Sequence, residues 1–227
     1  MAAGRTLVSI VVGEATRVSG LFQTARNAKC CVVLAPGAGG GLEHPFATAL
    51  AGELANLGIA TLRYQFPYME RERKRPDPPS LCHAAVRAAV QAARDLAPEV
   101  PLFAGGKSFG GRMTSQTHAV MPLEGVRGLI FLGFPLHPPQ QPSVARAAHL
   151  LEIRIPMLFL QGTRDDFASR NCLLTMIKKL PSSASVKLLE GADHSFRVLK
   201  KSGRTDADIR AEMLTTLTTW LADHLSP

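Results

Sequence analysis

The chain is 227 residues long, with 46% hydrophobic and 19% charged residues, which predicts one globular domain over residues 1–227. No apolar run approaches the ~20 residues of a membrane-spanning helix, which argues against a membrane protein. The net charge of +8 would suit a polyanionic partner such as nucleic acid, but the basic residues are spread along the chain. Their one local cluster, Arg71–Arg75, also contains an acid, so an ordinary basic surface is favoured over a nucleic-acid partner.

The first apolar run favours a strand over a secretion signal. Leu7–Val12 is short, is interrupted by Ser9 and is followed by Gly13, whereas a signal peptide has a longer apolar core. The four cysteines show neither metal-ligand spacing nor a disulfide framework. We therefore expect a reduced, cytoplasmic protein without a bound metal. These cysteines are Cys30, Cys31, Cys82 and Cys172.

Apolar runs and helical patterns then alternate along the chain. Strands are predicted at Leu7–Val12, Gly20–Gln23, Cys30–Ala35, Ile59–Tyr64, Leu102–Gly105, Gly128–Leu132, Met157–Leu160 and Val186–Leu189. Helices are predicted at Pro45–Leu57, from Ser80 as the capping residue to Leu96, at Arg112–Val120, Ala145–Leu151, Arg170–Lys179 and Asp206–Leu225, the last capped by Thr205 and Asp208. The segment Gln65–Pro79 is predicted to be a loop. This alternation predicts an α/β fold, with a mainly parallel sheet of about seven or eight strands and helices on both faces.

The polar residues of interest follow predicted strands directly. They are Gly37–Gly41, Ser108, His137, Asp165 and His194. The crevice of an open parallel sheet lies at the carboxyl ends of its strands, so we expect these residues to lie near one another.

Ser108 lies at the centre of a G-x-S-x-G pattern formed by Gly106–Gly110. A predicted strand precedes the pattern and a predicted helix follows it. A serine on a sharp strand-to-helix turn needs neighbours without side chains two positions before and after it. The alternative is a serine that only begins a helix. A Walker nucleotide-binding motif is excluded because Pro101 stands where its first glycine belongs, and a dinucleotide fingerprint from Gly37 is excluded by Leu42.

The chain also supplies a base and an acid for that serine. Serine needs a histidine to accept its proton, and a carboxylate to fix the tautomer of the histidine. Ser108, Asp165 and His194 occur in the order expected of an α/β-hydrolase. Asp166 remains an alternative for the acid, and His194 could instead be a loop histidine without a catalytic role.

Attack on an ester or amide creates an oxyanion that needs hydrogen-bond donors. The backbone N–H of Phe109 follows Ser108 and is the first candidate. The second is the N–H of Ala38, in the glycine-rich segment after the third strand. An ordinary flexible turn is the alternative interpretation of that segment.

These motifs resemble those of a compact α/β-hydrolase family, related to the testis-expressed hydrolase-like proteins and to the hydrolase-like module of certain chromatin-complex subunits. The chain is most similar to bacterial members and, more distantly, to dienelactone-hydrolase-type enzymes, although Ser108 stands where those carry cysteine. The resemblance implies an α/β-hydrolase fold and a Ser-His-Asp hydrolase site, and it does not supply a substrate. It rests on Pro36–Gly40, Phe66–Met69, Gly105–Gly111, Phe134–Pro138, Gln161–Asp165 and Ala192–Ser195.

We therefore predict a serine hydrolase of carboxylic esters or thioesters (EC class 3.1) that needs no cofactor. Some eukaryotic relatives serve as scaffolds, so the alternative is an interaction protein with a vestigial site. A third, weaker option is nucleic-acid association through the basic surface.

Four further residues are predicted to contact the substrate. Lys107 lies beside the nucleophile and is either a solvated lysine or a group that favours anionic acyl substrates. Phe66, Tyr68 and His137 are candidate walls of the site. The segment Gly133–Pro156 is too short for a large lid domain, so we expect a shallow, open pocket for small acyl groups.

Overall fold

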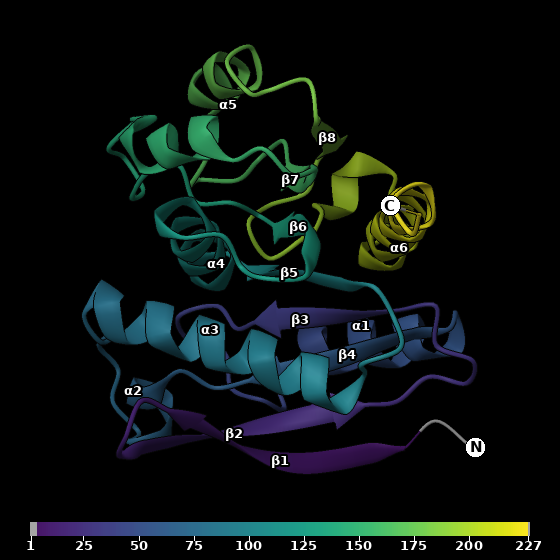
Figure 1. Ribbon diagram of the computed structural model, residues 1–227. Helices are drawn as coiled ribbons and strands as arrows, with labels where there is room; N and C mark the ends of the chain where they lie inside the picture. The colour runs from purple at the N-terminus through teal and green to yellow at the C-terminus, as the bar shows by residue number, and fades with distance from the viewer. Residues whose placement is uncertain (1–3, 227) are drawn as a thin grey trace.

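The computed structural model describes residues 4–226 and contains an eight-stranded sheet with the order β1-β2-β4-β3-β5-β6-β7-β8 (Figure 1). Strands β3 to β8 pair in parallel, while β1 and β2 add an antiparallel edge next to β4. The predicted mainly parallel sheet is therefore confirmed. The strands are β1 Arg5–Val12, β2 Thr16–Gln23, β3 Cys30–Ala35, β4 Ile59–Tyr64, β5 Leu102–Lys107, β6 Val126–Leu132, β7 Met157–Gly162 and β8 Ala184–Leu189.

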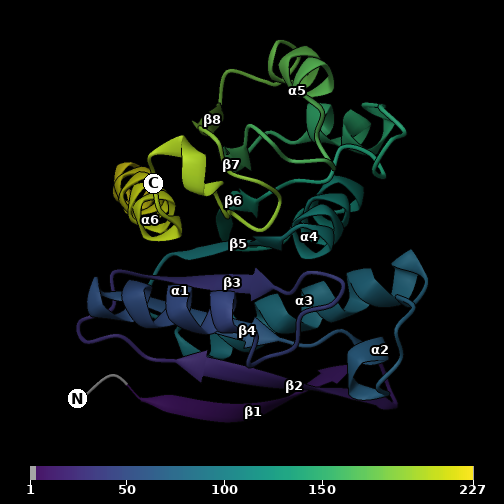
Figure 2. The same cartoon turned by 180° about the vertical axis from the view of Figure 1, so that it is seen from behind.

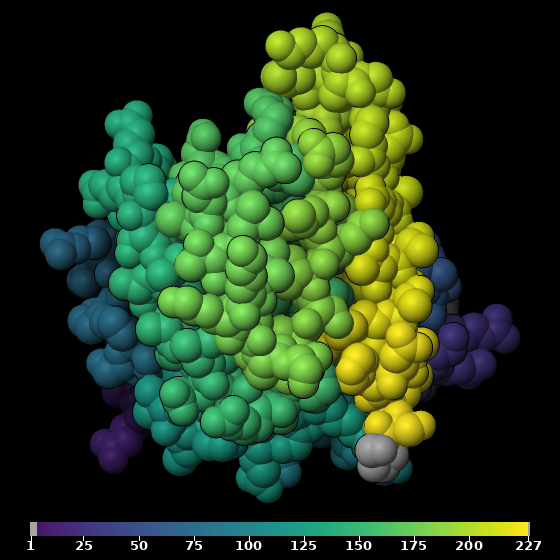
Figure 3. Space-filling view, turned by 90° about the horizontal axis from the view of Figure 1, so that it is seen from above, coloured from purple at the N-terminus to yellow at the C-terminus, as the bar shows by residue number. Residues whose placement is uncertain are grey.

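Helices cover both faces of the sheet. Helices α1 and α6 pack on one face, and α3 and α4 pack on the other, as the two opposite views show (Figures 1 and 2). From above, the yellow surface of α6 runs along the side of the green surface that includes α5 (Figure 3). Among the described residues, no helix combines the length and the apolar character needed to cross a membrane. The helices are α1 Pro45–Asn56, α2 Pro67–Glu70, α3 Pro79–Leu96, α4 Phe109–Val120, α5 Arg170–Ile177 and α6 Asp206–Asp223, with 3₁₀ helices η1 Ala145–Glu152 and η2 Lys200–Ser202.

Strand β3 illustrates why the central strands have continuous apolar sequences. All six of its residues are buried. Successive side chains of a strand point to opposite faces. Cys31, Val33 and Ala35 accordingly join the core under α3 and α4, while Cys30, Val32 and Leu34 join the core under α1 and α6. Because helices cover both faces, neither set of side chains reaches water.

The structure corrects the predicted start of helix α3. The helix begins at Pro79 and is preceded by Pro78, and no side chain caps it. Ser80 is therefore inside the helix and is not its cap. Proline suits the first helical position because its φ is fixed near the helical value and its missing N–H would have no partner there.

Of two other predicted segments, the structure changes one and confirms the other. The predicted loop Gln65–Pro79 contains the single turn of helix α2. In contrast, the capping box of α6 is confirmed: the Thr205 hydroxyl accepts from the Asp208 N–H, and the Asp208 carboxylate accepts from the Thr205 N–H. Between β6 and β7 the structure has only loops and η1, so no large lid domain covers the sheet there.

Candidate active site

The turn from β5 to α4 holds Ser108 in a backbone conformation that few residues adopt. Its φ is 49° and its ψ is −115°, and such conformations cost ~1–3 kcal/mol. Glycines make the turn possible. A Cβ on Gly106 would lie 2.3 Å from the carbonyl oxygen of Ala35, and a Cβ on Gly110 would lie 2.5 Å from those of Ala35 and Pro36. The two flanking glycines thus let the end of β3 pack directly against the turn.

Ser108, His194 and Asp165 form a continuous chain of hydrogen-bonding contacts. Ser108 Oγ lies 2.8 Å from Nε2 of His194, and Nδ1 of His194 lies 2.7 Å from Oδ2 of Asp165. Asp165 is buried, with 3% of its surface exposed, while Asp166 is exposed. The structure therefore brings Asp165, and not Asp166, to the histidine. An Nδ1–H that donates to the carboxylate leaves Nε2 free to accept the serine proton.

The buried carboxylate of Asp165 accepts two further hydrogen bonds. Gln161 Nε2 donates to Oδ2 at 2.6 Å, and the Phe167 N–H donates to Oδ1 at 2.8 Å. The other amide atom of Gln161 accepts from the Phe134 N–H at 2.8 Å, which fixes the orientation of its amide. Sequence reasoning missed Gln161, although a glutamine in the otherwise apolar strand β7 is a signal that could have found it. The Phe167 ring also packs against the His194 ring, with centroids 4.4 Å apart and an angle of 37° between the ring planes.

Lys107 is largely buried against the loop that carries His194. Its Nζ donates to the His194 carbonyl oxygen at 2.6 Å, and it lies 5.1 Å from the centre of the Phe196 ring. Burial lowers the pKa of Lys107 to about 8, although the nearby Asp165 and Asp193 carboxylates act in the opposite direction. The interpretation of Lys107 as a solvated lysine is therefore wrong.

The candidate oxyanion donors lie in two turns, one after β3 and one after β5. Neither the Phe109 N–H nor the Ala38 N–H has an acceptor within residues 4–226. The Gly40 N–H donates to the Gly37 carbonyl at 2.9 Å, and this fixes the plane of the peptide group whose N–H belongs to Ala38. The Tyr68 hydroxyl donates to the Ala38 carbonyl at 2.7 Å and holds the next peptide group.

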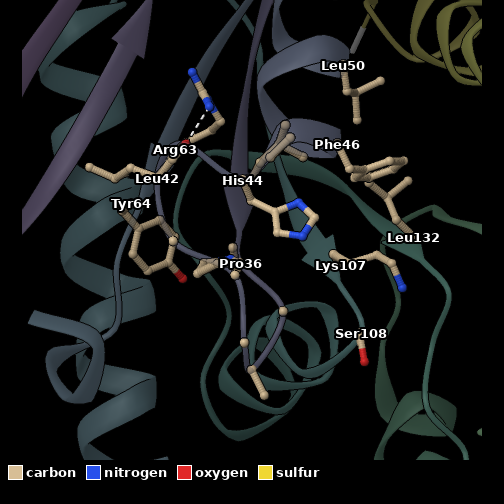
Figure 4. A pocket seen from close by; sticks show the side chains of 18 of the residues that line it. Pro36, Leu42, His44, Phe46, Leu50, Arg63, Tyr64, Lys107, Ser108 and Leu132 are labelled. Atoms are coloured by element: carbon tan, nitrogen blue, oxygen red, sulfur yellow. Dashed lines mark hydrogen bonds between the residues drawn. The ribbon is translucent and has the colours of Figure 1, made fainter. Parts of the chain in front are cut away.

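A cavity of about 380 Å³ opens beside Ser108 (Figure 4). The glycine-rich segment after β3, the first turn of α1 and the end of β4 supply most of its wall. Figure 4 shows Ser108 and Arg63 at opposite ends of the view, with His44 and Pro36 between them. The lining residues are Leu34–Leu42, His44, Phe46, Ala47, Leu50, Arg63, Tyr64, Lys107, Ser108, Leu132, His194 and Ser195.

The expectation that Phe66, Tyr68 and His137 form walls of the site needs correction. At most 1% of each side chain is exposed, and none of the three lines the cavity. Phe66 packs edge-on against Phe109 with centroids 5.4 Å apart, while Tyr68 holds Ala38 through its hydroxyl. The His137 ring accepts from the Ser169 N–H at 2.9 Å and ties the loop after β6 to the start of α5. All three residues thus support the parts that surround the site instead of contacting a ligand.

Within residues 4–226, no group of three or more His, Cys, Asp or Glu side chains is arranged to hold a metal ion.

Comparison with protein families gives a match to the family described as Alpha/beta hydrolase domain over residues 28–222.

Solved structures share the fold at low sequence identity. Dienelactone hydrolase from Anabaena variabilis has 20% identity and a TM-score of 0.78, covering 99% of this chain and 100% of that chain. A serine hydrolase without a lid from Xanthomonas campestris has 17% identity and a TM-score of 0.73, with 97% and 96% covered. A serine hydrolase homologue from Coxiella burnetii has 19% identity and a TM-score of 0.72, with 96% and 98% covered.

Proposed function

The chain belongs to the alpha/beta hydrolase family, and we propose that it is a serine hydrolase of carboxylic esters or thioesters. The observation that carries this proposal is the continuous contact from Ser108 through His194 to the buried Asp165. A serine with only a structural role would not need a histidine at 2.8 Å that is itself held by a carboxylate. The alternative, an interaction protein with a vestigial site, does not explain this arrangement.

The proposed reaction has two steps. Ser108 Oγ attacks the acyl carbon while Nε2 of His194 takes the hydroxyl proton, and the resulting imidazolium is stabilised by Asp165. The proton then passes to the leaving alcohol or thiol as the acyl–oxygen or acyl–sulfur bond breaks, which leaves the acyl group on Ser108. Water, deprotonated by His194, attacks this acyl-enzyme, and the acid is released as the serine regains its proton. The N–H groups of Phe109 and Ala38 would stabilise the negative oxygen in both steps.

The volume of the cavity supports a substrate with a small acyl group. Its volume of about 380 Å³ lies near the lower end of the range for ligand pockets, ~300–1,000 Å³. Lys107 lines it, and we propose that the Lys107 ammonium favours acyl groups with negative charge. Hydrolysis of matched neutral and carboxylate-bearing esters by Lys107→Ala tests this role. An equal loss on both esters would refute it.

The decisive test of the enzyme proposal is labelling with a fluorophosphonate probe. We expect wild type to be labelled and Ser108→Ala, shown to be folded by circular dichroism, to remain unlabelled. A panel of short-chain esters and thioesters would then identify the leaving group. Folded wild type that shows no Ser108-dependent labelling would favour the interaction protein instead.

Three narrower assignments are also part of the proposal. We propose that residues 1–227 form one domain, that the protein works in the cytoplasm, and that its nearest relatives are the bacterial members of the testis-expressed hydrolase-like group. The single sheet, whose strands lie between Arg5 and Leu189, supports the first of these. The four free cysteines are compatible with the second.

A further inference from the structure

The cavity beside Ser108 has a one-sided electrostatic character. Its ionisable lining residues are His44, Arg63, Tyr64, Lys107 and His194, and no aspartate or glutamate lines it within residues 4–226. The first turn of α1 also contributes to the wall and contains no acid. The unpaired N–H groups at a helix N-terminus carry partial positive charge. The wall therefore favours a negatively charged ligand.

Arg63, at the end of the cavity away from Ser108, is only partly paired (Figure 4). Its side chain is 2% exposed. Nη1 donates to the Leu42 carbonyl and to the Thr48 hydroxyl, the latter at 2.8 Å. Nε and Nη2 have no hydrogen-bond partner among the described residues. A buried donor without a partner destabilises the fold, so a guanidinium left in this state is unusual.

The two unpaired nitrogens form a specific recognition edge. Nε and Nη2 lie on one edge of the planar guanidinium, where their N–H bonds run parallel and match the two oxygens of a carboxylate. The next residue, Tyr64, does not add to this edge, because neighbouring side chains of a strand point to opposite faces and Tyr64 packs in the core under α3 and α4. The structure thus leaves two unused donors of one guanidinium at the end of the cavity away from Ser108.

We propose that Arg63 binds a carboxylate at the far end of the acyl group of the substrate. The substrate class is then half-esters or half-thioesters of short dicarboxylic acids, and the inference rests on the proposed hydrolase function. Nε and Nη2 are covered in this structure. A carboxylate therefore reaches them when the guanidinium edge turns toward the cavity.

The test compares pairs of substrates of equal shape. Monomethyl succinate, glutarate and adipate are each paired with a neutral methyl ester in which an isopropyl group replaces the terminal carboxylate. We expect wild type to prefer the acidic member of at least one pair by about ten- to hundredfold in kcat/KM. Arg63→Gln should lose this preference, so that its kcat/KM on the acidic ester falls about ten- to hundredfold further than its kcat/KM on the neutral ester. Arg63→Lys, which keeps the charge but not the parallel N–H bonds, should retain a smaller preference.

Thr48→Val serves as the matched control because it removes an acceptor of Nη1 and leaves the Nε–Nη2 edge untouched. It should keep the wild-type preference. An equal loss on both members of a pair in Arg63→Gln, or no preference by wild type in any pair, would overturn the inference. Should Arg63→Gln not fold, Arg63→Lys and wild type still decide the question.

A binding measurement separates failure of this inference from failure of the hydrolase proposal. Calorimetry with glutarate on Ser108→Ala reports the anion site without any turnover. Fluorophosphonate labelling of wild type reports Ser108 without the anion site. Labelled protein that neither binds dicarboxylates nor prefers acidic esters refutes only the Arg63 site, whereas unlabelled protein refutes the hydrolase.

Discussion

Replacing Lys107 by methionine should stabilise the fold at neutral pH. The lysine holds a positive charge in a mostly buried position, and methionine has a similar length without the charge. What the substitution removes is the hydrogen bond from Nζ to the His194 carbonyl, 2.6 Å long, and the contact of the ammonium with the Phe196 ring. The sign of the net effect depends on which of these contributions is larger.

The pKa of Lys107 provides the magnitude. Burial lowers this pKa from 10.5 to about 8, and at ~1.4 kcal/mol per tenfold change in proton affinity this corresponds to a penalty of ~3 kcal/mol for the charged amine. Loss of the hydrogen bond to His194 costs ~1 kcal/mol in this half-exposed loop. We therefore expect Lys107→Met to be more stable than wild type by ~2 kcal/mol at neutral pH.

The pH dependence gives the sharper test. Below the folded pKa of about 8, the amine is charged in both the folded and the unfolded protein, so the folded protein carries the full penalty of the buried charge. As the pH rises toward 10.5, the folded amine is neutral while the unfolded amine is still charged, so wild type gains stability. The free energy of unfolding of Lys107→Met relative to that of wild type should thus fall by ~2–3 kcal/mol between about pH 7 and about pH 10.

Urea unfolding followed by the fluorescence of Trp220, the one tryptophan of the chain, measures this difference in free energy of unfolding. Lys74→Met, in the exposed loop after α2, controls for the loss of one positive charge. A difference between Lys107→Met and wild type that stays constant with pH would refute the reasoning. So would a variant that is clearly less stable than wild type at neutral pH.

Three further predictions concern the proposed machinery. Asp165→Asn should lower kcat by about a thousandfold or more because the histidine loses its tautomer and orientation, whereas Asp166→Asn should stay within about twofold, as measured with a short-chain ester; similar losses in both would contradict the assignment. Gly110→Ala should lose more than ~4 kcal/mol of stability or fail to fold, as thermal unfolding would show, because its Cβ would lie 2.5 Å from two backbone oxygens; a stable variant would contradict this close approach. Tyr68→Phe should lower kcat by about three- to tenfold with little change in KM, because the hydroxyl that holds the Ala38 carbonyl is lost; an unchanged kcat would show that this bond does not position the oxyanion loop.

Much of the site was predictable from sequence because of a property of parallel sheets. The apolar runs locate the strands, and the carboxyl ends of parallel strands lie at one edge of the sheet. Ser108, Asp165 and His194 follow β5, β7 and β8, which fixes their neighbourhood before any coordinate is known. The flanking glycines also predicted the sharp turn at Ser108, since the end of β3 leaves no room for a Cβ.

The direction and burial of single side chains were decided only by the tertiary structure. Asp165 and Asp166 are adjacent in sequence, and their roles separate because one side chain turns inward to Gln161 and the other faces solvent. Lys107 has the composition of a surface residue, but the loop that carries His194 closes over it. In both cases a contact with His194, 29 residues from Asp165 and 87 residues from Lys107 in the sequence, holds the side chain.

Tertiary packing also explains why the predicted substrate contacts Tyr68 and His137 do not line the cavity. The strand-end position of Tyr68 and His137 suggested cavity walls, yet both pack inward because distant backbone groups satisfy their polar atoms. Arg63 has an ordinary place at the end of a buried strand, and its sequence neighbours give no sign of a binding site. Its unpaired nitrogens become evident only once β4, α1 and the glycine-rich segment enclose a common cavity. Sequence determines which residues gather at the sheet edge, and packing determines which of their atoms remain free to bind.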